Sequence, residues 1–254
     1  MRAEDQVVLA TTTYYDVLTN PVQQARFLAS LHMAEEAKTH GYPLIVLDGS
    51  PLPRIAIELG DRGAMVLRQQ TSGMGPSRRE VFFYAVQYCY EYGRKIVVWL
   101  EAEKWDFIRS VSAFVERLLN GGAHVVLPRR SQLAWDDYNE FQRTTEQEAN
   151  AVYIEATGLQ YADPMFGPMG FSLGVEEHTV VLKSRLPEGV PDTYWQLYAP
   201  VLALKADVRV AVSEEIDFHY DPDQKTAENG DPQTNQKRIM QRDTLCNAFR
   251  KLAA

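Results

Sequence analysis

Polar side chains that could bind a ligand follow several apolar runs of the sequence. Asp48 and Ser50 come directly after one such run, Glu101 and Glu103 follow another, and Thr13 lies at the end of the first. In an open α/β sheet, ligands bind beyond the carboxyl ends of the strands. If these runs are parallel strands, the polar residues share one edge of the sheet. The pattern therefore favours a ligand-binding cleft at that edge.

The two glutamates could bind a divalent cation. Glu101 and Glu103 are two residues apart, so their side chains share one face of an extended segment. Hard cations such as Mg²⁺ prefer oxygen ligands and often keep water and ligand phosphate in their shell. The alternative is an exposed acidic turn before a helix, where carboxylates favour the positive end of the helix dipole.

Asp48 lies in a turn that could contact a nucleoside. It precedes Gly49 and Ser50, and its carboxylate could accept a hydrogen bond from a nucleobase or a ribose. The alternative is that the carboxylate only stabilises the turn and caps the next helix.

Arg78 follows a glycine-containing loop, residues 72–77, that leads into a helix. Such a loop lets the backbone approach a ligand closely, and an arginine can pair with phosphate oxygens. The segment lacks the Gly-Lys-Ser/Thr ending of a P-loop. A solvated basic helix start is the alternative.

His219 follows the last apolar run and is a candidate metal ligand. Neutral imidazole is a common ligand, and the end of a strand is a suitable place for one. A lone histidine is nevertheless more often structural, and both interpretations remain open.

The apolar runs and periodic segments predict an alternation of strands and helices, which is most regular in the first half of the chain. Strands are expected at residues 7–12, 44–47, 64–68, 96–100, 124–128 and 208–212. Helices are expected at residues 21–39, 54–59, 78–92, 105–119, 136–157 and 236–252, and after residue 192. Segments 163–171 and 221–236 have the composition of loops. Continuous apolar strands separated by helices predict a mostly parallel sheet covered on both faces.

The composition limits the class of protein. With 26 Lys and Arg against 34 Asp and Glu, the chain has a formal net charge of −8, which argues against broad binding of nucleic acid. Cys89 and Cys246 are too few and too distant for a disulfide framework or a zinc site. No signal peptide or membrane-spanning run is recognised, so a cytoplasmic location is expected. The oligomeric state stays open, and a homo-oligomer is compatible with the sequence.

The domain organisation predicted for the chain is a single α/β domain, because neither an internal repeat nor a linker is found. Residues 1–128 would form a nucleotide-binding half, and residues 129–220 an acceptor and metal half. A C-terminal loop and helix would follow at residues 221–254.

The order of these motifs resembles that of family-2-like glycosyltransferases with the A-type (GT-A) fold, which is Rossmann-like. Residues 12–16 resemble the loop after their first strand, and residues 47–50 resemble their Asp-Asp-Gly-Ser nucleotide-binding turn. Residues 75–79 resemble their Gly-x-x-Ala-Arg-Asn segment. Residues 100–103 occupy the place of their Asp-x-Asp motif, with glutamates for both aspartates. Residues 191–192 resemble their Glu-Asp pair, and His219 falls where many members have a metal-binding histidine.

The resemblance implies an enzyme that transfers a sugar from a nucleoside diphosphate sugar to a hydroxyl acceptor. It implies a divalent metal, Mn²⁺ or Mg²⁺, that would stabilise charge on the departing nucleotide. Under it, Glu103 and His219 would hold the metal, and Asp192 or Asp163 would face the acceptor as a base. The nucleotide-binding residues would be Thr13, Asp48, Ser50, Arg78 and Glu101.

Two alternatives stay open. A sugar-phosphate nucleotidyltransferase has a related fold, but would carry a glycine- and arginine-rich loop after its first strand, and residues 11–16 contain no glycine. A catalytically silent relative that binds a nucleotide or a protein partner is the other.

Overall fold

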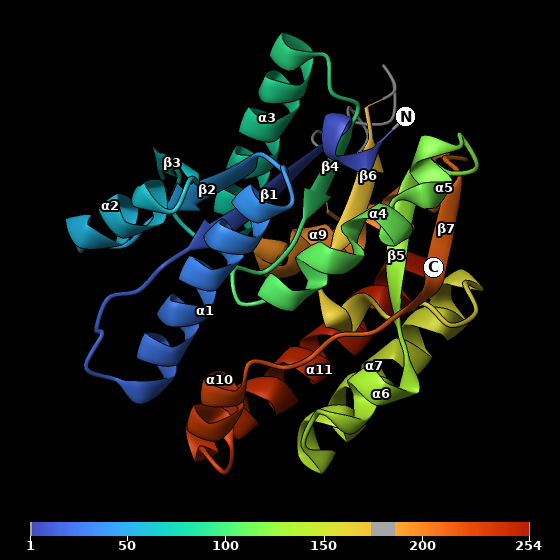
Figure 1. Cartoon of the computed structure of the whole chain (residues 1–254). Coiled ribbons are helices and arrows are strands. Elements are labelled where there is room, and N and C mark those ends of the chain that lie inside the picture. Colours follow the sequence, from blue (N-terminus) through green and yellow to red (C-terminus); the bar gives the residue numbers. More distant parts are fainter. Residues whose placement is uncertain (1, 174–185, 254) are drawn as a thin grey trace.

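The strands of the protein form one mixed sheet, as seen in a computed structural model that describes residues 2–173 and 186–253 (Figure 1). Within these residues, the seven strands lie in the order β3-β2-β1-β4-β6-β5-β7. Neighbouring strands are parallel, except that β6 runs antiparallel to both β4 and β5. The strands are β1 (Val7–Thr13), β2 (Leu44–Asp48), β3 (Met65–Arg68), β4 (Ile96–Trp99), β5 (Val125–Arg130), β6 (Met169–Ser172) and β7 (Val210–Ile216).

The central strands are apolar along their length because both faces of the sheet are covered. Every residue of β2 and β4 is buried, and so is all of β1 except Thr12. The α-helices are α1 (Pro21–Thr39), α2 (Pro53–Asp61), α3 (Met74–Tyr92), α4 (Val111–Phe114), α5 (Glu116–Leu119), α6 (Gln132–Asp136), α7 (Glu140–Thr157), α9 (Trp195–Lys205), α10 (Pro222–Glu228) and α11 (Pro232–Ala253). The 3₁₀ helices are η1 (Ala3–Asp5), η2 (Trp105–Ser110), η3 (Pro164–Phe166) and η4 (Asp192–Tyr194).

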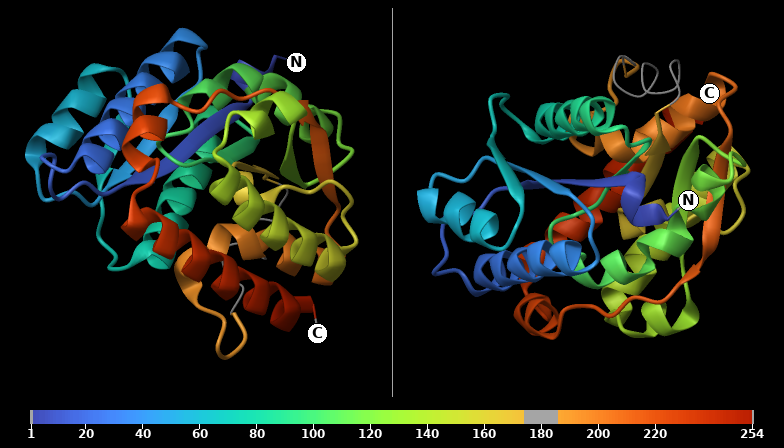
Figure 2. Two further views of the ribbon diagram at one scale, coloured as in Figure 1. Left: turned by 90° about the horizontal axis from the view of Figure 1, so that it is seen from below. Right: turned by 45° about the horizontal axis from the view of Figure 1, so that its top comes forward.

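Two apolar cores lie on the two faces of the sheet (Figure 2). One core is closed by side chains of α1, α2, η2 and α4, such as Phe27 and Phe114. The other is closed by α3, α7, α9 and α11, with Phe82, Trp195 and Phe249 among its buried rings. A mostly parallel sheet with helices on both faces is thereby confirmed.

The N-terminal elements agree with the sequence prediction closely. Helix α1 has the predicted bounds, because the Asn20 side chain caps its first turn through Val22 N and Pro21 starts it. Helix α3 begins earlier, at Met74. The helix predicted for residues 105–119 is divided into η2, α4 and α5, because Val115 leaves the helical conformation at φ −89° and ψ 4°.

Segment 163–171, predicted as a loop, contains η3 and the start of strand β6 instead. Gly170 is required in β6, since a Cβ there would lie 2.6 Å from Val126 Cγ1 and 3.0 Å from Leu118 Cδ1. Proline, glycine and methionine, which suggested a loop, here allow a strand to pass tightly between β4 and β5.

Segment 221–236, also predicted as a loop, is mostly helical. It contains α10 and the first turn of α11, and each helix begins at the proline of an Asp-Pro pair. Asp221 accepts hydrogen bonds from Asp223 N and Gln224 N, and Asp231 accepts one from Thr234 N. These polar residues are helix caps, and the loop prediction was wrong for this segment.

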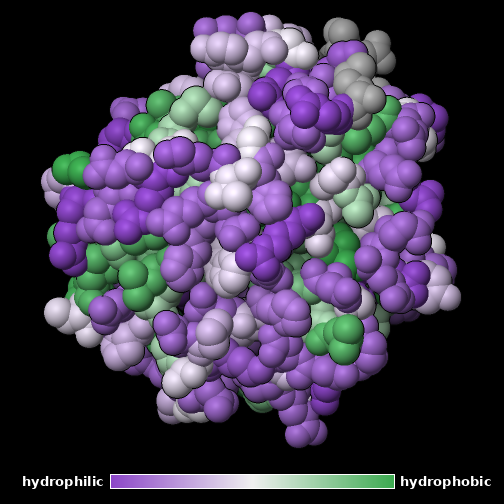
Figure 3. Space-filling model, in the orientation of Figure 1, coloured by the Kyte–Doolittle hydropathy of each residue, from purple (hydrophilic) through white to green (hydrophobic). Residues whose placement is uncertain are grey.

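The surface in Figure 3 is mostly hydrophilic, with hydrophobic side chains in separate patches. Within residues 2–173 and 186–253, no helix is long and apolar enough to cross a membrane.

Candidate functional site

A cavity of about 820 Å³ opens at the carboxyl ends of β1, β2 and β4. Its walls come from the loops after these strands, from residues 68–73 and the start of α3, and from α1, α7, α10 and α11. Of the residues predicted for the site, Thr13, Arg78, Glu101 and Glu103 line it. The cavity thus lies where open α/β sheets bind their ligands.

Asp48 lies directly behind the cavity wall and holds the turn that forms it. The residue is 1% exposed, and its Oδ1 accepts hydrogen bonds from Thr13 Oγ1 at 2.9 Å and Ser50 Oγ at 2.5 Å. Its Oδ2 lies 3.9 Å from Arg68 Nη1. A Cβ at Gly49 would overlap the Gln69 side chain. Thr13, Gly49 and Arg68 line the cavity, so Asp48 and Ser50 fix the wall from behind.

Arg78 presents a buried guanidinium to the cavity. Its Nη1 donates to Thr193 O at 2.6 Å and to Gln196 Oε1 at 2.8 Å, and the group lies over the Trp99 ring at 5.1 Å. Burial lowers the pKa of Arg78, while Glu101 raises it. Its Nε has no hydrogen-bond partner among the described residues.

Asp192 lies beside the start of α3, at the rim of the cavity. It accepts a hydrogen bond from Arg79 Nη2 at 2.5 Å, and a Cβ at Gly75 would overlap its backbone carbonyl. Its neighbour Tyr194 lines the cavity, whereas Asp192 itself is not among the lining residues.

Glu101 and Glu103 line the cavity beside basic side chains. Arg26 Nε lies 3.9 Å from a Glu103 oxygen. Burial raises the pKa of Glu101, against the opposing effects of Lys104 and Arg78. Neither carboxylate accepts a hydrogen bond from the part of the chain that the structure describes.

His219 is not among the residues that line the cavity, whereas Glu103 is. Beyond β7 the side chains alternate, so Phe218 and Tyr220 are buried and His219 is exposed. The backbone N–H of His219 donates to Asp106 Oδ2 at 2.8 Å, and the residue is absent from the cavity lining.

The donor set does not fit the predicted metal. Without His219, only Glu101 and Glu103 remain of the expected ligands, and a divalent ion at Glu103 would lie against the guanidinium of Arg26. Within residues 2–173 and 186–253, no three His, Cys, Asp or Glu side chains are grouped to hold an ion. Charge repulsion from a fixed cation weakens binding of a second one.

Asp163 is engaged in a buried ion pair away from the cavity. It is 3% exposed and accepts hydrogen bonds from Arg130 Nε at 2.5 Å and Nη2 at 2.8 Å. Asn150 Nδ2 donates to it at 2.6 Å. Arg130 also pairs with Glu146 at 2.7 Å and stacks 3.6 Å over the Trp135 ring. Asp163 therefore holds α7 to the sheet, and it is not among the residues that line the cavity.

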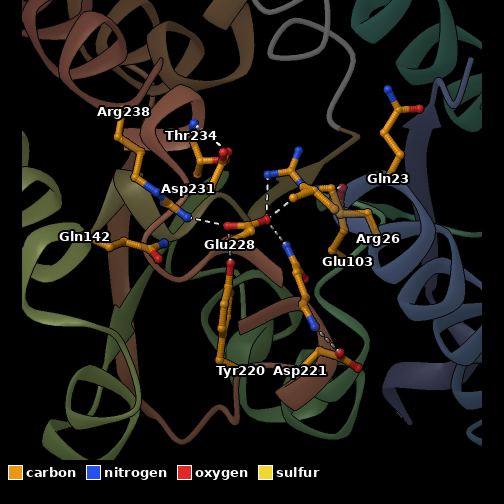
Figure 4. A network of polar contacts seen from close by, with 12 residues as sticks. Gln23, Arg26, Glu103, Gln142, Tyr220, Asp221, Glu228, Asp231, Thr234 and Arg238 are labelled. Carbon is orange, nitrogen blue, oxygen red and sulfur yellow. Dashed lines mark hydrogen bonds and ion pairs between the residues drawn. The ribbon is translucent and has the colours of Figure 1, made fainter. Parts of the chain in front are cut away.

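Glu228 organises a polar network over the cavity that the sequence did not reveal (Figure 4). Its carboxylate is 2% exposed and accepts hydrogen bonds from Arg26 at 2.9 and 2.7 Å and from Arg238 at 2.5 Å. Gln224 Nε2 and Tyr220 Oη donate to it at 2.8 and 3.0 Å. The network joins α1, α10 and α11 around one carboxylate. The sequence feature that could have pointed to this network is the two Asp-Pro helix caps, because they mark where α10 and α11 begin.

Two lysines add positive charge to the walls. Lys104 is buried, donates to Tyr138 Oη at 3.0 Å and lies 5.1 Å from the Phe166 and Phe218 rings. Lys237 of α11 reaches solvent inside the cavity, and its Nζ makes no hydrogen bond or ion pair with the described residues. Burial and Arg26 lower the pKa of Lys237.

The cavity is locally positive in a chain whose formal net charge is −8. Its described lining contains six basic side chains, Arg26, Arg68, Arg78, Lys104, Lys237 and Arg238. It contains four acidic side chains, Glu101, Glu103, Glu146 and Glu228. Such an excess favours an anionic ligand.

The sheet order, the antiparallel β6 and the cavity at the strand ends together define a GT-A fold, as the motif order predicted. The chain is similar to glucosyl-3-phosphoglycerate synthase from Mycobacterium tuberculosis in complex with Mn²⁺, uridine diphosphate and glucosyl-3-phosphoglycerate. That similarity has a TM-score of 0.54 and 14% identity over 95% of this chain and 80% of that one.

A second similar structure is mannosyl-3-phosphoglycerate synthase from Rubrobacter xylanophilus. It has a TM-score of 0.55 and 14% identity, over 96% of this chain and 73% of that one. No protein-family model matches the chain, and no curated protein matches its sequence. At these identities the comparisons establish the fold and leave the reaction to be argued from the site.

Proposed function

We propose that the protein transfers a sugar from a nucleoside diphosphate sugar to a hydroxyl acceptor. The observation that carries the proposal is the positively charged cavity at the carboxyl ends of β1, β2 and β4 in a GT-A fold. Its volume of about 820 Å³ lies within the range of small-molecule sites. The similar proteins named above, one of them bound to uridine diphosphate, support a donor of this class.

The nucleoside would bind at the end of the cavity formed by Thr13, Gly49 and Gln69. Asp48 and Ser50 would act as positioning residues, since their hydrogen bonds set the orientation of Thr13. Arg78 would face the diphosphate from the far side of this turn. Its rigid, already buried guanidinium would need little reorganisation when charge develops on the leaving group.

The divalent metal predicted from the sequence is not part of this proposal, because the donor set does not fit it. The set of candidates for the catalytic base is also smaller than the sequence predicted. Asp163 is fixed by Arg130 and Asn150, so only Asp192 remains as a candidate, and it would have to part from Arg79 to reach an acceptor.

Binding of nucleoside diphosphates tests the proposal directly. Isothermal titration with UDP, GDP, ADP and CDP, and with the matching triphosphates, should give micromolar or tighter binding for one diphosphate. Incubation with the matching nucleotide sugars should then release that diphosphate. Preference for a triphosphate would contradict sugar transfer and indicate a nucleotidyltransferase.

A catalytically silent nucleotide-binding relative is the second candidate. It is favoured by one observation, that both predicted acceptor-side carboxylates are ion-paired. Diphosphate binding without release from any nucleotide sugar, in the presence of varied hydroxyl acceptors, would support this candidate.

A further inference from the structure

We infer that Lys237 and Arg26 bind the diphosphate of the donor directly, so that donor binding does not depend on a divalent cation. The inference rests on the proposed function and names the groups that neutralise its substrate. It replaces the metal site predicted at Glu103 with a protein cation pair.

Lys237 is a basic side chain of the cavity wall for which the described part of the chain supplies no hydrogen-bond or ion-pair partner. Its neighbour Arg238, by contrast, is held by Glu228 at 2.5 Å. An ammonium with open donors, facing a cavity with excess positive charge, is suited to an anionic ligand oxygen.

Arg26 is held in place before any ligand arrives. Its Nε and Nη2 both donate to Glu228 Oε1, whereas no hydrogen bond from its Nη1 to the described residues is found. Arg26 lines the cavity, and the N–H groups of its Nη1 are open to a ligand as far as the described residues are concerned. Because it is already ordered, it loses little conformational entropy when it binds phosphate.

Arg26 lies at one of the carboxylates predicted to bind a metal, and Lys237 lines the same cavity. Arg26 is 3.9 Å from Glu103, and the charge of Lys237 interacts with Arg26, Glu103 and Glu101. A diphosphate placed here would meet two positive groups, of which Arg26 is already held in place. These would stabilise the negative charge that grows on the leaving diphosphate as the bond to the sugar breaks.

Titrations in EDTA and in Mn²⁺ test this inference. UDP, the other nucleoside diphosphates and inorganic pyrophosphate are titrated into the full chain under both conditions. We expect pyrophosphate and at least one nucleoside diphosphate to bind as tightly in EDTA as they do in Mn²⁺. Binding that appears only with Mn²⁺ would overturn the inference and leave sugar transfer standing.

Two substitutions distinguish a cation pair from a metal site, because a cation pair predicts opposite changes in diphosphate affinity for the two variants. Lys237→Gln should weaken diphosphate binding in EDTA by about tenfold. Glu103→Gln should strengthen it, since it removes the negative charge beside Arg26, whereas loss of a metal ligand would weaken it. Lys205→Gln, at an exposed lysine of α9 outside the cavity, is the matched control. An unchanged affinity for Lys237→Gln would also overturn the inference.

Pyrophosphate separates the failure of the inference from that of the proposed function. If pyrophosphate binds in EDTA with the expected pattern of variants but no nucleoside diphosphate binds, the anion site stands and the nucleotide-sugar proposal fails. If neither binds under any condition, both are overturned. Thermal unfolding of each variant confirms that the chain is folded.

Discussion

At the scale of single residues, Glu228 shows how one buried carboxylate can fix charges on several helices. Burial alone would raise the pKa of Glu228, but Arg26 and Arg238 lower it from 4.5 to about 2. The carboxylate therefore stays ionised in the folded protein at pH values where an exposed glutamate is protonated. Breaking such a buried pair costs more than an exposed pair, since a charge is left without a partner.

We expect Glu228→Gln to lower the free energy of unfolding at pH 7 by about 3 kcal/mol. Because the folded pKa is below the unfolded one, the contribution of Glu228 is complete above about pH 4.5 and is lost as the pH falls toward 2. The difference between wild type and variant should therefore narrow at pH 3. Urea denaturation at the two pH values measures it, with the exposed Glu155→Gln as control. A difference that stays constant would contradict the assignment.

Asp192 is the remaining candidate for a catalytic base. Asp192→Asn keeps the size of the side chain and removes its basicity. If the enzyme inverts configuration through this residue, turnover should fall about 100-fold or more while diphosphate affinity changes little. Arg79→Met is the informative companion, because it frees the carboxylate from its ion pair without removing it. Near-normal turnover of the Asn variant would eliminate Asp192 as the base.

At the scale of elements, periodic and strongly apolar segments were predictable, and segments shaped by neighbours were not. Strands β1, β2 and β4 and helix α1 follow from local pattern and capping. Strand β6 does not, because only packing against β4 and β5 makes its sequence extended. The residues that line the cavity fall into the same two groups, those that the sequence predicted and those that it did not. Residues at strand ends were found from the sequence, whereas Arg26, Glu228 and Lys237 come together only through the tertiary arrangement of α1, α10 and α11.

Gly170 tests the packing argument for β6. Gly170→Ala should lower stability by about 1–3 kcal/mol, since its Cβ would overlap Val126 and Leu118. Gly60→Ala in α2 is the matched control, because nothing lies within 4 Å of its Cβ and alanine favours the helix. Thermal unfolding of the two variants should therefore shift in opposite directions. Equal effects would mean that space at β6 is not limiting.

At the scale of the whole molecule, helix α1 from the first part of the chain meets helix α10 from its last part at the cavity. Arg26 on α1 and Glu228 on α10 are 202 residues apart, and α1 also packs against α10 (Figure 1). The C-terminal helices thereby form a wall of the site while α11 packs on α7 and α9. We therefore expect the affinity of the cavity for anions to depend on how firmly this wall is attached to α1.

The contact between Arg26 on α1 and Glu228 on α10 predicts a local pattern of amide hydrogen exchange. Arg26→Met should leave the sheet intact but release α10 and the first turns of α11, because Glu228 loses its two hydrogen bonds from α1. Amide exchange in residues 222–238 should accelerate by about tenfold, with β1, β2 and β4 unchanged. Arg62→Met is the control, since its ion pair with Glu35 joins α2 to α1 on the outer surface. Acceleration spread evenly over the chain would show instead that Arg26 supports global stability. Unchanged exchange at α10 would show that packing alone holds this wall, and the preorganised guanidinium on which diphosphate binding depends would lose its structural basis.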